Sequence, residues 1–229
     1  MSLNVLNANF NLPVLVPEYV PYSFDHPLEV NEANAIGTLN ILEATKLLPN
    51  LKRIVCTSSS EVYGSALMKS INENHPLNPT SPYAASKVAA DRYCYSYIKT
   101  YDLPITIIRP FNTYGPRMRI KDGRAIPNFL KQALTGEDLT IYGNGSQTRS
   151  FCFVTDLVEG IFRLLISEQH KPVNIGNPNE MTIRQMADKI LQATQSNSRI
   201  VNVPLPEDDP KTRQPNITLA KEILNWEPK

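Results

Sequence analysis

A tyrosine and a lysine one helical turn apart are the pair in this sequence best suited to proton transfer. Tyr83 and Lys87 occur in the segment S-P-Y-A-A-S-K, and on a helix both side chains leave the same face. A free tyrosine has a pKa of about 10 and is a poor base at neutral pH, but a neighbouring ammonium stabilises the phenolate and lowers that pKa. Such a pair can remove a hydroxyl proton while hydride leaves the same carbon. The same spacing is common on exposed helices. The residues around the pair must therefore decide whether it is catalytic.

A cluster of hydroxyl groups with one carboxylate lies upstream of this pair. The cluster, T-S-S-S-E-V-Y-G at 57–64, follows the apolar run L-K-R-I-V-C, whose β-branched residues predict a strand. A second such run, P-I-T-I-I-R-P-F-N, follows the Tyr83 helix and ends at Asn112. Strand, helix and strand in this order predict a parallel βαβ unit. Because polar residues that follow parallel strands meet at the carboxyl edge, we expect 58–61 and Asn112 at the same edge.

The remaining elements follow from the spacing of apolar residues. Residues 1–29 are rich in proline and show neither a helical period nor a clear strand. Helices are predicted at about 28–48, 82–101, 126–134, 155–166, 182–194 and 219–226, and further strands at L-T-I-Y-G and P-V-N-I-G. Thr155 and Thr182 are candidate N-caps of two of these helices. The alternation of strands and helices predicts an α/β fold with a parallel sheet.

The overall composition is that of a folded protein without a dominant charge. The chain has 229 residues, of which 41% are hydrophobic and 20% charged, and 23 basic against 22 acidic residues leave a net charge of +1. These values argue against disorder. A charge near zero provides no general attraction for nucleic acid or for an anionic membrane. A phosphate-bearing ligand would therefore depend on a few local arginines.

Cysteines, histidines and the first residues add no catalytic motif. The three cysteines are widely spaced and odd in number, which favours buried reduced thiols in a reducing compartment: Cys56, Cys94 and Cys152. His26, His75 and His170 lack the spacing of metal ligands, so we predict no metal site and expect all three to be exposed or incidental. The N-terminal residues lack the features of a signal peptide, and no apolar run approaches the roughly 20 residues of a membrane span. We expect a cytoplasmic protein.

The motifs of this chain resemble those of one enzyme family. They are T-S-S-S-E-V-Y-G, S-P-Y-A-A-S-K, R-P-F-N-T-Y-G-P-R-M, L-T-I-Y-G-N-G-S-Q-T-R-S-F, V-N-I-G-N-P and D-D-P-K-T-R-Q-P. They are similar to motifs of the extended short-chain dehydrogenases/reductases, specifically the NAD-dependent nucleotide-sugar epimerases, dehydratases and decarboxylases. The resemblance covers about 26–229. From Arg109 onward the motifs look most like those of UDP-glucuronate decarboxylases (UDP-xylose synthases), whereas N-P-T-S-P-Y-A-A-S-K looks more like the 4,6-dehydratases and epimerases.

The resemblance implies a role for each matching residue. The implied catalytic residues are Ser59, Ser60, Glu61, Tyr83 and Lys87; the implied contacts to NAD are Ser58, Tyr83 and Lys87; and the implied substrate-binding residues are Asn112, Arg119, Arg124, Tyr142, Arg149 and Arg213. Two phosphates need bidentate donors, which suits the arginines. Purely structural roles stay open for three of these residues, because Glu61 could cap a turn, Asn112 could form an Asx-turn and Arg149 could be part of a surface ion pair.

The implied reaction is NAD-dependent modification of a nucleotide sugar through a 4-keto intermediate, above all decarboxylation of UDP-glucuronate to UDP-xylose. Ser60 argues against dTDP-glucose dehydratases, which resemble this chain but carry Asp there, and not against GDP-mannose dehydratases. A 4,6-dehydratase or a 4-epimerase is therefore the alternative. A hypothesis of another class is an inactive homologue that acts as a binding or dimerisation module. The helices near 30–48 and 82–101 resemble those of the family's dimer interface, so we expect a homodimer.

The resemblance also implies a part of the fold that we do not find in the sequence. The family begins with a strand and a G-x-x-G-x-x-G turn before a helix whose N-terminus holds the pyrophosphate, whereas the first glycine here is Gly37. We therefore expect a Rossmann-like sheet without its first βαβ units, and poor binding of NAD. Residues 1–111 are assigned to the remaining NAD-binding domain, to which 153–177 return. Residues 112–152 and 178–229 are assigned to a smaller α/β lobe that binds the nucleotide sugar.

Overall fold

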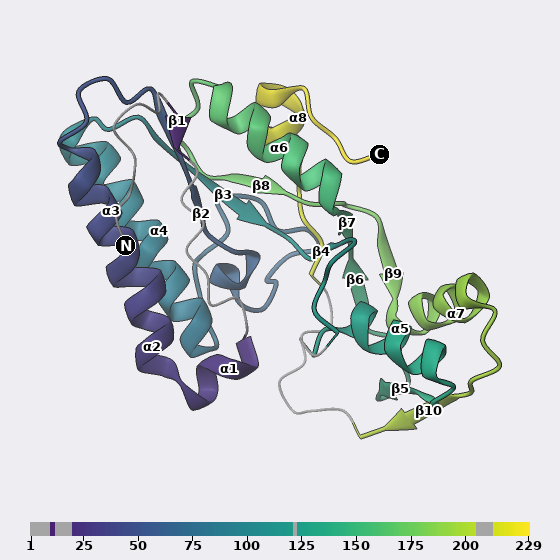
Figure 1. Ribbon diagram of the computed structural model, residues 1–229. Helices are drawn as coiled ribbons and strands as arrows, with labels where there is room; N and C mark the ends of the chain where they lie inside the picture. The colour runs from purple at the N-terminus through teal and green to yellow at the C-terminus, as the bar shows by residue number, and fades with distance from the viewer. Residues whose placement is uncertain (1–9, 12–19, 121–122, 205–212) are drawn as a thin grey trace.

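The centre of the molecule is a parallel sheet whose strands come from distant parts of the chain (Figure 1). The computed structural model describes residues 10–11, 20–120, 123–204 and 213–229. Within them, four strands pair in the order β1-β2-β3-β8, and all of these pairs are parallel. The strands are β1 (Phe10–Asn11), β2 (Arg53–Thr57), β3 (Ile105–Pro110) and β8 (Val173–Ile175). The predicted α/β fold with a parallel sheet is confirmed.

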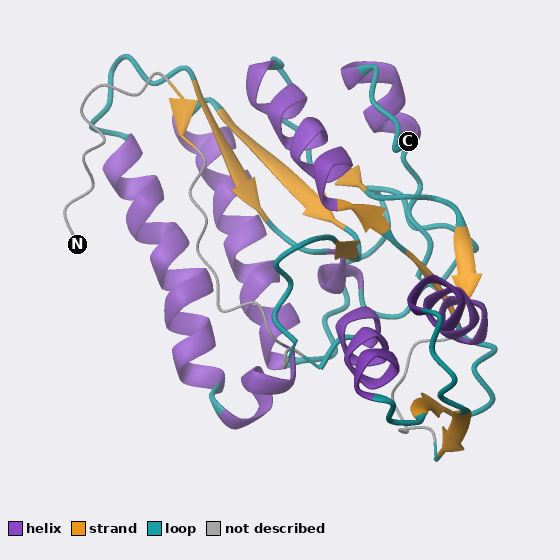
Figure 2. Cartoon of the chain, turned by 45° about the vertical axis from the view of Figure 1, so that its right-hand side comes forward, coloured by secondary structure: helices purple, strands orange, loops and turns teal. Residues whose placement is uncertain are grey.

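Helices cover both faces of this sheet (Figure 2). One face carries α2 (Pro27–Asn31), η1 (Glu32–Ile36), α3 (Gly37–Thr45) and α4 (Pro82–Tyr101), and the other carries α6 (Val154–Ile166) and α8 (Thr218–Leu224). Because side chains alternate along a strand, Ile54 packs with Leu42 on the first face, whereas Val55 packs in the cluster of Leu164 and Trp226 on the second. Burial on both faces explains why the strands are continuous apolar runs.

The helix α4, which carries Tyr83 and Lys87, begins and ends where local signals place it. The Ser81 hydroxyl accepts a hydrogen bond from the backbone N–H of Ala84 at 3.1 Å, and Pro82 occupies the first turn, where its missing N–H costs nothing. The helix ends at Asp102, which has a φ of 51°. The 82–101 prediction is therefore confirmed.

The chain before residue 30 is more regular than predicted. The structure contains β1, a helix α1 (Val20–Asp25) and an α2 that begins at Pro27. The expectation that 1–29 has neither helix nor strand is wrong for these residues; 1–9 and 12–19 lie outside the described part. The cause is tertiary, because β1 is defined by its pairing with β2, Phe10 opposite Arg53. The predicted 28–48 helix is divided into α2, the π-helical η1 and α3.

The two predicted threonine caps have different outcomes. Thr182 caps α7 (Ile183–Thr194) with a capping box, in which its hydroxyl accepts from the backbone of Gln185 and the Gln185 side chain accepts in return. Thr155, by contrast, is not a cap, because α6 begins at Val154 with Phe153 in the N-cap position. The apolar contacts of α6 with the sheet, rather than a side-chain cap, hold its start.

A second group of elements follows the carboxyl ends of β3 and β8, at the lower right of Figure 1. Helices α5 (Ala125–Thr135) and α7 pack on strands β5 (Leu139–Tyr142) and β10 (Ile200–Val203) around a separate apolar cluster. Sequence periodicity did not predict β10, nor the short strands β4 (Thr113–Tyr114), β6 (Thr148–Ser150), β7 (Cys152–Phe153) and β9 (Glu180–Thr182). These strands are two to four residues long, and pairing with partners defines them.

Candidate active site

The hydroxyl cluster after β2 forms a tight, buried turn. Ser58, Ser59 and Ser60 are at most 8% exposed. Ser60 begins the 3₁₀ helix η2 (Ser60–Tyr63), and the Ser59 hydroxyl caps it by accepting from the backbone N–H of Glu61 at 3.2 Å. Gly64 ends the turn with a φ of +65°. The turn thus holds three hydroxyls and the Glu61 carboxylate at the carboxyl end of a central strand.

The Tyr83–Lys87 pair lies at the same end of β2. Tyr83 is 8% and Lys87 is 4% exposed, so neither belongs to an outer helix face. The Lys87 ammonium donates to the carbonyl of Thr57 at 3.2 Å, and it lies 5.9 Å from the centre of the Tyr83 ring. Thr57 directly precedes the serine turn. The geometry therefore joins the lysine of the pair to the strand end from which the hydroxyl cluster starts.

A small hollow lies beside this contact. Its lining includes Thr57, Ser58 and Lys87. The Ser58 hydroxyl is buried with no hydrogen-bond partner among the described residues, and the same holds for the side-chain oxygen of Asn34. The Asn34 amide nitrogen donates to the Ser86 hydroxyl at 3.0 Å on the Tyr83 helix. Because buried polar groups are normally paired, the unpaired Ser58 hydroxyl is a candidate for binding a polar group from outside the described residues.

An ion pair connects the serine turn to the C-terminal part of the chain. Arg213 donates from a terminal nitrogen to the Glu61 carboxylate, and the two side chains are only 10% and 22% exposed. The segment after Arg213 is held by backbone hydrogen bonds, from Ile71 N–H to the Gln214 carbonyl and from Asn216 N–H to the Ile71 carbonyl, both at 2.8 Å. Two predicted site residues far apart in sequence therefore lie in direct contact.

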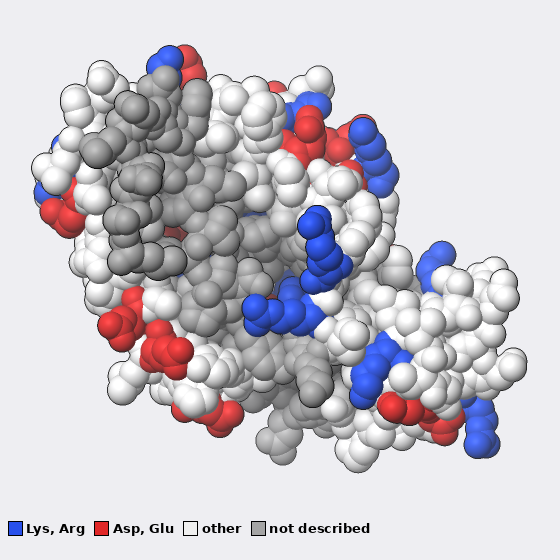
Figure 3. All heavy atoms as spheres, viewed as in Figure 1, with Lys and Arg blue, Asp and Glu red and all other residues white. Residues whose placement is uncertain are grey.

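The other predicted substrate-binding residues lie at or beyond the end of β3. Asn112 is half-buried, and its carbonyl accepts from Cys152 N–H at 2.9 Å, which aligns β4 with β7. Arg149 is half-buried on β6, and one terminal nitrogen donates to the Thr148 carbonyl at 2.8 Å. Three others are exposed: Arg119, Arg124 and Tyr142. Figure 3 shows basic side chains grouped near the middle of the face that it views.

The comparison with protein families decides the relationship of the chain. The family model described as GDP-mannose 4,6 dehydratase matches residues 17–229. The chain belongs to this family. The expected resemblance to nucleotide-sugar epimerases, dehydratases and decarboxylases is confirmed.

Two UDP-glucuronic acid decarboxylases are similar to this chain over most of its length. UDP-glucuronic acid decarboxylase 6 of Arabidopsis thaliana is 43% identical over 209 residues, which cover 89% of this chain and 60% of the relative. UDP-glucuronic acid decarboxylase 1 of Danio rerio is 42% identical over 217 residues, which cover 93% of this chain and 51% of the relative. The chain thus spans between half and two thirds of the length of these curated relatives.

A solved structure of the same family shares the fold. The dTDP-glucose 4,6-dehydratase DesIV of Streptomyces venezuelae, solved with NAD bound, superposes with a TM-score of 0.86 at 28% identity and covers 95% of this chain and 67% of its own.

Two buried charges beside the site were not predicted. Asp91, on α4, and Arg109, on β3, are 1% and 2% exposed. Burial raises the pKa of Asp91, but hydrogen bonds and charge from Arg109 and then Arg92 outweigh burial, so that the pKa lies below its usual value. Two sequence signals could have revealed them. Asp91 extends the four-residue spacing of Tyr83 and Lys87, and Arg109 is the one charged residue of an apolar strand.

The histidine predictions hold only in part. His75 is 3% exposed, so the expectation of an exposed histidine is wrong at this position. Its Nε2 accepts from Leu67 N–H at 3.1 Å, which leaves the proton on Nδ1, 2.8 Å from the Pro76 carbonyl. His75 therefore fixes the loop after η2. His26 and His170 are exposed.

The three cysteines are buried free thiols, as predicted, and burial raises the pKa of Cys152 to about 12. Within the described ranges, no group of histidine, cysteine and acidic residues could hold a metal ion. None of the helices that the structure describes is long and apolar enough to cross a membrane.

Proposed function

We propose that this site oxidises and then reduces a nucleotide sugar at C4, and that the substrate is UDP-glucuronate. The observation that carries the proposal is the buried Tyr83–Lys87 pair at the end of β2, with the lysine bound to Thr57 beside the serine turn. The similarity to UDP-glucuronic acid decarboxylases over most of the chain supports the choice of sugar. NAD, when bound, would take the C4 hydride and return it.

In this proposal the residues at the end of β2 handle protons and the sugar hydroxyl. Tyr83 acts as a phenolate that the Lys87 ammonium stabilises, and it takes the proton of the C4 hydroxyl to become a neutral phenol. Ser59 hydrogen-bonds the reacting hydroxyl, and Ser60 and Glu61 face the sugar at C5. Tyr83, Lys87 and Ser58 also hold the nicotinamide end of NAD, a role that suits the unpaired Ser58 hydroxyl.

The substrate is held by residues farther along the chain. Asn112, Arg149 and Arg213 bind the diphosphate and the sugar, and Arg119, Arg124 and Tyr142 line the outer part of the same site. Bidentate arginine–phosphate pairs would provide both affinity and orientation. In the proposed domain division, residues 1–111 and 153–177 bind the cofactor, and residues 112–152 and 178–229 form the lobe that binds the nucleotide sugar.

Decarboxylation follows from the chemistry of the oxidised sugar. A ketone at C4 makes the C5 carboxylate part of a β-keto acid. The bond from C5 to the carboxyl carbon breaks, carbon dioxide leaves, and the electron pair passes toward the C4 oxygen. A proton is then added at C5 before the C4 ketone is reduced. Ser60 suits this outcome better than loss of a hydroxyl from C6, because a serine is a poor proton donor.

Release of carbon dioxide tests the proposed reaction. The assay supplies NAD at millimolar concentration. UDP-glucuronate labelled at the carboxyl carbon should give labelled carbon dioxide and a UDP-pentose. UDP-glucose should give neither product. An epimerised UDP-sugar without carbon dioxide would favour the 4-epimerase, and a 4-keto-6-deoxy sugar from another nucleotide sugar would favour the dehydratase.

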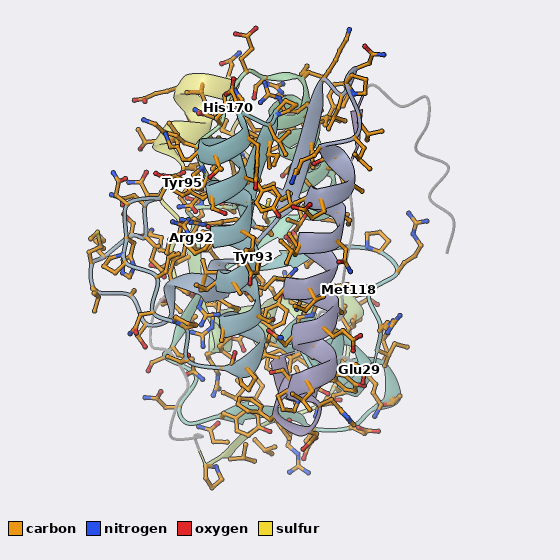
Figure 4. All side chains as sticks on the ribbon, turned by 90° about the vertical axis from the view of Figure 1, so that its left-hand side faces the viewer. Glu29, Arg92, Tyr93, Tyr95, Met118 and His170 are labelled. Carbon is orange, nitrogen blue, oxygen red and sulfur yellow. The ribbon has the colours of Figure 1, made fainter. Side chains whose placement is uncertain are left out.

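We further propose that two copies of the chain associate through the helices near 30–48 and 82–101. Figure 4 shows these helices side by side, with Tyr93 and Tyr95 on α4 and Glu29 on α2. Large apolar side chains are exposed on this surface, among them Leu28 at 85%, Ile36 at 42% and Tyr93 at 36%. Burying them in a four-helix contact would remove apolar surface from water.

A charge on this surface is expected to separate the dimer. Ile36→Glu should weaken association at least about tenfold in sedimentation velocity, because a carboxylate would be buried without a partner. Leu134→Glu is the matched control, since Leu134 is 72% exposed on α5. A wild-type chain that remains monomeric at high micromolar concentration would contradict the proposal.

A further inference from the structure

Asp91 and Arg109 form a buried ion pair directly beside the Tyr83–Lys87 face of α4. The Nε of Arg109 donates to Oδ2 of Asp91 at 2.8 Å, and Nη2 donates to Oδ1 at 3.0 Å. This bidentate fork fixes the guanidinium plane relative to the carboxylate. Asp91 lies one turn after Lys87 on the same helical face and lines the same hollow. The fork therefore ties the catalytic face of α4 to β3.

The remaining nitrogen of Arg109 reaches the other half of the site. Nη1 donates to the Tyr63 hydroxyl at 3.0 Å and to the Glu73 carbonyl at 3.3 Å. The guanidinium carbon also lies 5.0 Å from the centre of the Tyr63 ring. Tyr63 is the last residue of η2, the turn that presents Ser60 and Glu61. Its hydroxyl donates in turn to Oδ1 of Asn174 on β8 at 2.7 Å.

Charge balance alone does not explain a buried arginine at this position. Asp91 already pairs with Arg92, whose side chain is 45% exposed and can supply a cation at little desolvation cost. A buried ion pair is also often no more stabilising than apolar residues of the same volume. Arg109 in addition fixes the orientation of two groups relative to each other, because its rigid planar guanidinium holds the Asp91 carboxylate on one side and the Tyr63 phenol on the other.

We propose that Arg109 is a positioning residue that sets the Ser59–Glu61 turn against Tyr83 and Lys87. It acts through Tyr63 on η2 and through Asp91 on α4. The catalytic consequence rests on the proposed function, whereas the ordering of η2 does not. The ordering of η2 and its catalytic consequence can therefore be tested separately on the same chain.

Tyr63→Phe removes the hydroxyl that Arg109 and Asn174 share and keeps the buried ring, so that the core remains filled. Amide hydrogen exchange of the full chain reports the result without any substrate. Val62 N–H bonds the Ser59 carbonyl and Gly64 N–H bonds the Glu61 carbonyl, so these two amides report the order of η2. We expect both to exchange about tenfold faster, the effect of one lost hydrogen bond, while α4 amides keep their rates.

Two further variants separate positioning from general stability. Arg109→Lys keeps the charge and loses the fork, and should speed exchange both in η2 and in the α4 turn that contains Lys87. Tyr97→Phe is the matched control: it also removes a tyrosine hydroxyl that donates to a side-chain oxygen, that of Glu43, but at the outer side of α4, and η2 should not respond. If wild type turns over UDP-glucuronate, Tyr63→Phe should lower kcat about tenfold or more with KM nearly unchanged.

Each outcome decides the proposal. Faster exchange confined to η2 in Tyr63→Phe supports it, whether or not the chain shows turnover. Unchanged exchange at Val62 and Gly64 overturns it, and so does a uniform increase over the whole chain, since that would mean a purely structural role. If Arg109→Lys fails to fold, Tyr63→Phe alone decides. Absence of turnover in wild type would count against the proposed function only.

Discussion

Tyr83→Phe is expected to lower the turnover of UDP-glucuronate by roughly 10²- to 10⁴-fold, the usual contribution of a positioned acid–base group. The phenylalanine keeps the ring that is buried at the start of α4 and removes the phenolic oxygen that is proposed to accept the C4 proton. Binding of the nucleotide sugar should change little, because the proposed diphosphate contacts are made elsewhere, by Arg149 and Arg213. Carbon dioxide release and calorimetric titration with UDP-glucuronate measure the two quantities separately.

The control for this variant is a tyrosine of the same helix. Tyr95 is 42% exposed on α4, and Tyr95→Phe should leave both turnover and substrate affinity unchanged. A Tyr83→Phe chain with at least half the wild-type rate would contradict the role of Tyr83 as the base. Equal losses in both variants would point to the helix as a whole rather than to the hydroxyl.

Gly64→Ala is expected to lower the free energy of unfolding by about 3 kcal/mol, because it combines two costs. Gly64 has a φ of +65°, and an added Cβ would lie 1.9 Å from the backbone carbonyl oxygen of Asn78. Backbone atoms cannot move away as a flexible side chain can, so η2 or the 78–80 loop must shift. Because Gly64 ends η2, the same shift should displace Glu61 and reduce turnover. Urea unfolding measures the loss of stability.

Gly136→Ala separates the two costs. Gly136 has a similar φ of +73°, but an added Cβ there meets no atom within 4 Å. Only the left-handed backbone is strained, and we expect a loss of about 1 kcal/mol. If the two variants lose the same stability, the contact with Asn78 does not restrain η2, and the proposed coupling between this turn and the site weakens.

The parts of the site that sequence could predict are those with local signals. Tyr83 and Lys87 lie in the helix α4, which is capped by Ser81 and has Pro82 in its first turn, so their common face follows from helical spacing. The serine turn could be placed at a strand end because β2 is an apolar run. The roles assigned to these residues stay predictions that the variants above test.

Other features had no signal of this kind. Glu61 and Arg213 were assigned to different roles, yet they contact each other across 152 residues of sequence. His75 carried no spacing that would distinguish a buried loop anchor from an exposed histidine.

The sequence by itself determined the strand–helix–strand unit around α4, the capping of its helix and the end of the sheet at which the serines and Tyr83 lie. These features depend on periodicity, capping and β-branched runs, which act over a few residues. Only the tertiary structure decided that β1 pairs with β2 and that Arg109 joins Asp91 to Tyr63. Contacts of this kind depend on how distant segments meet when the core closes, and no local pattern encodes that meeting.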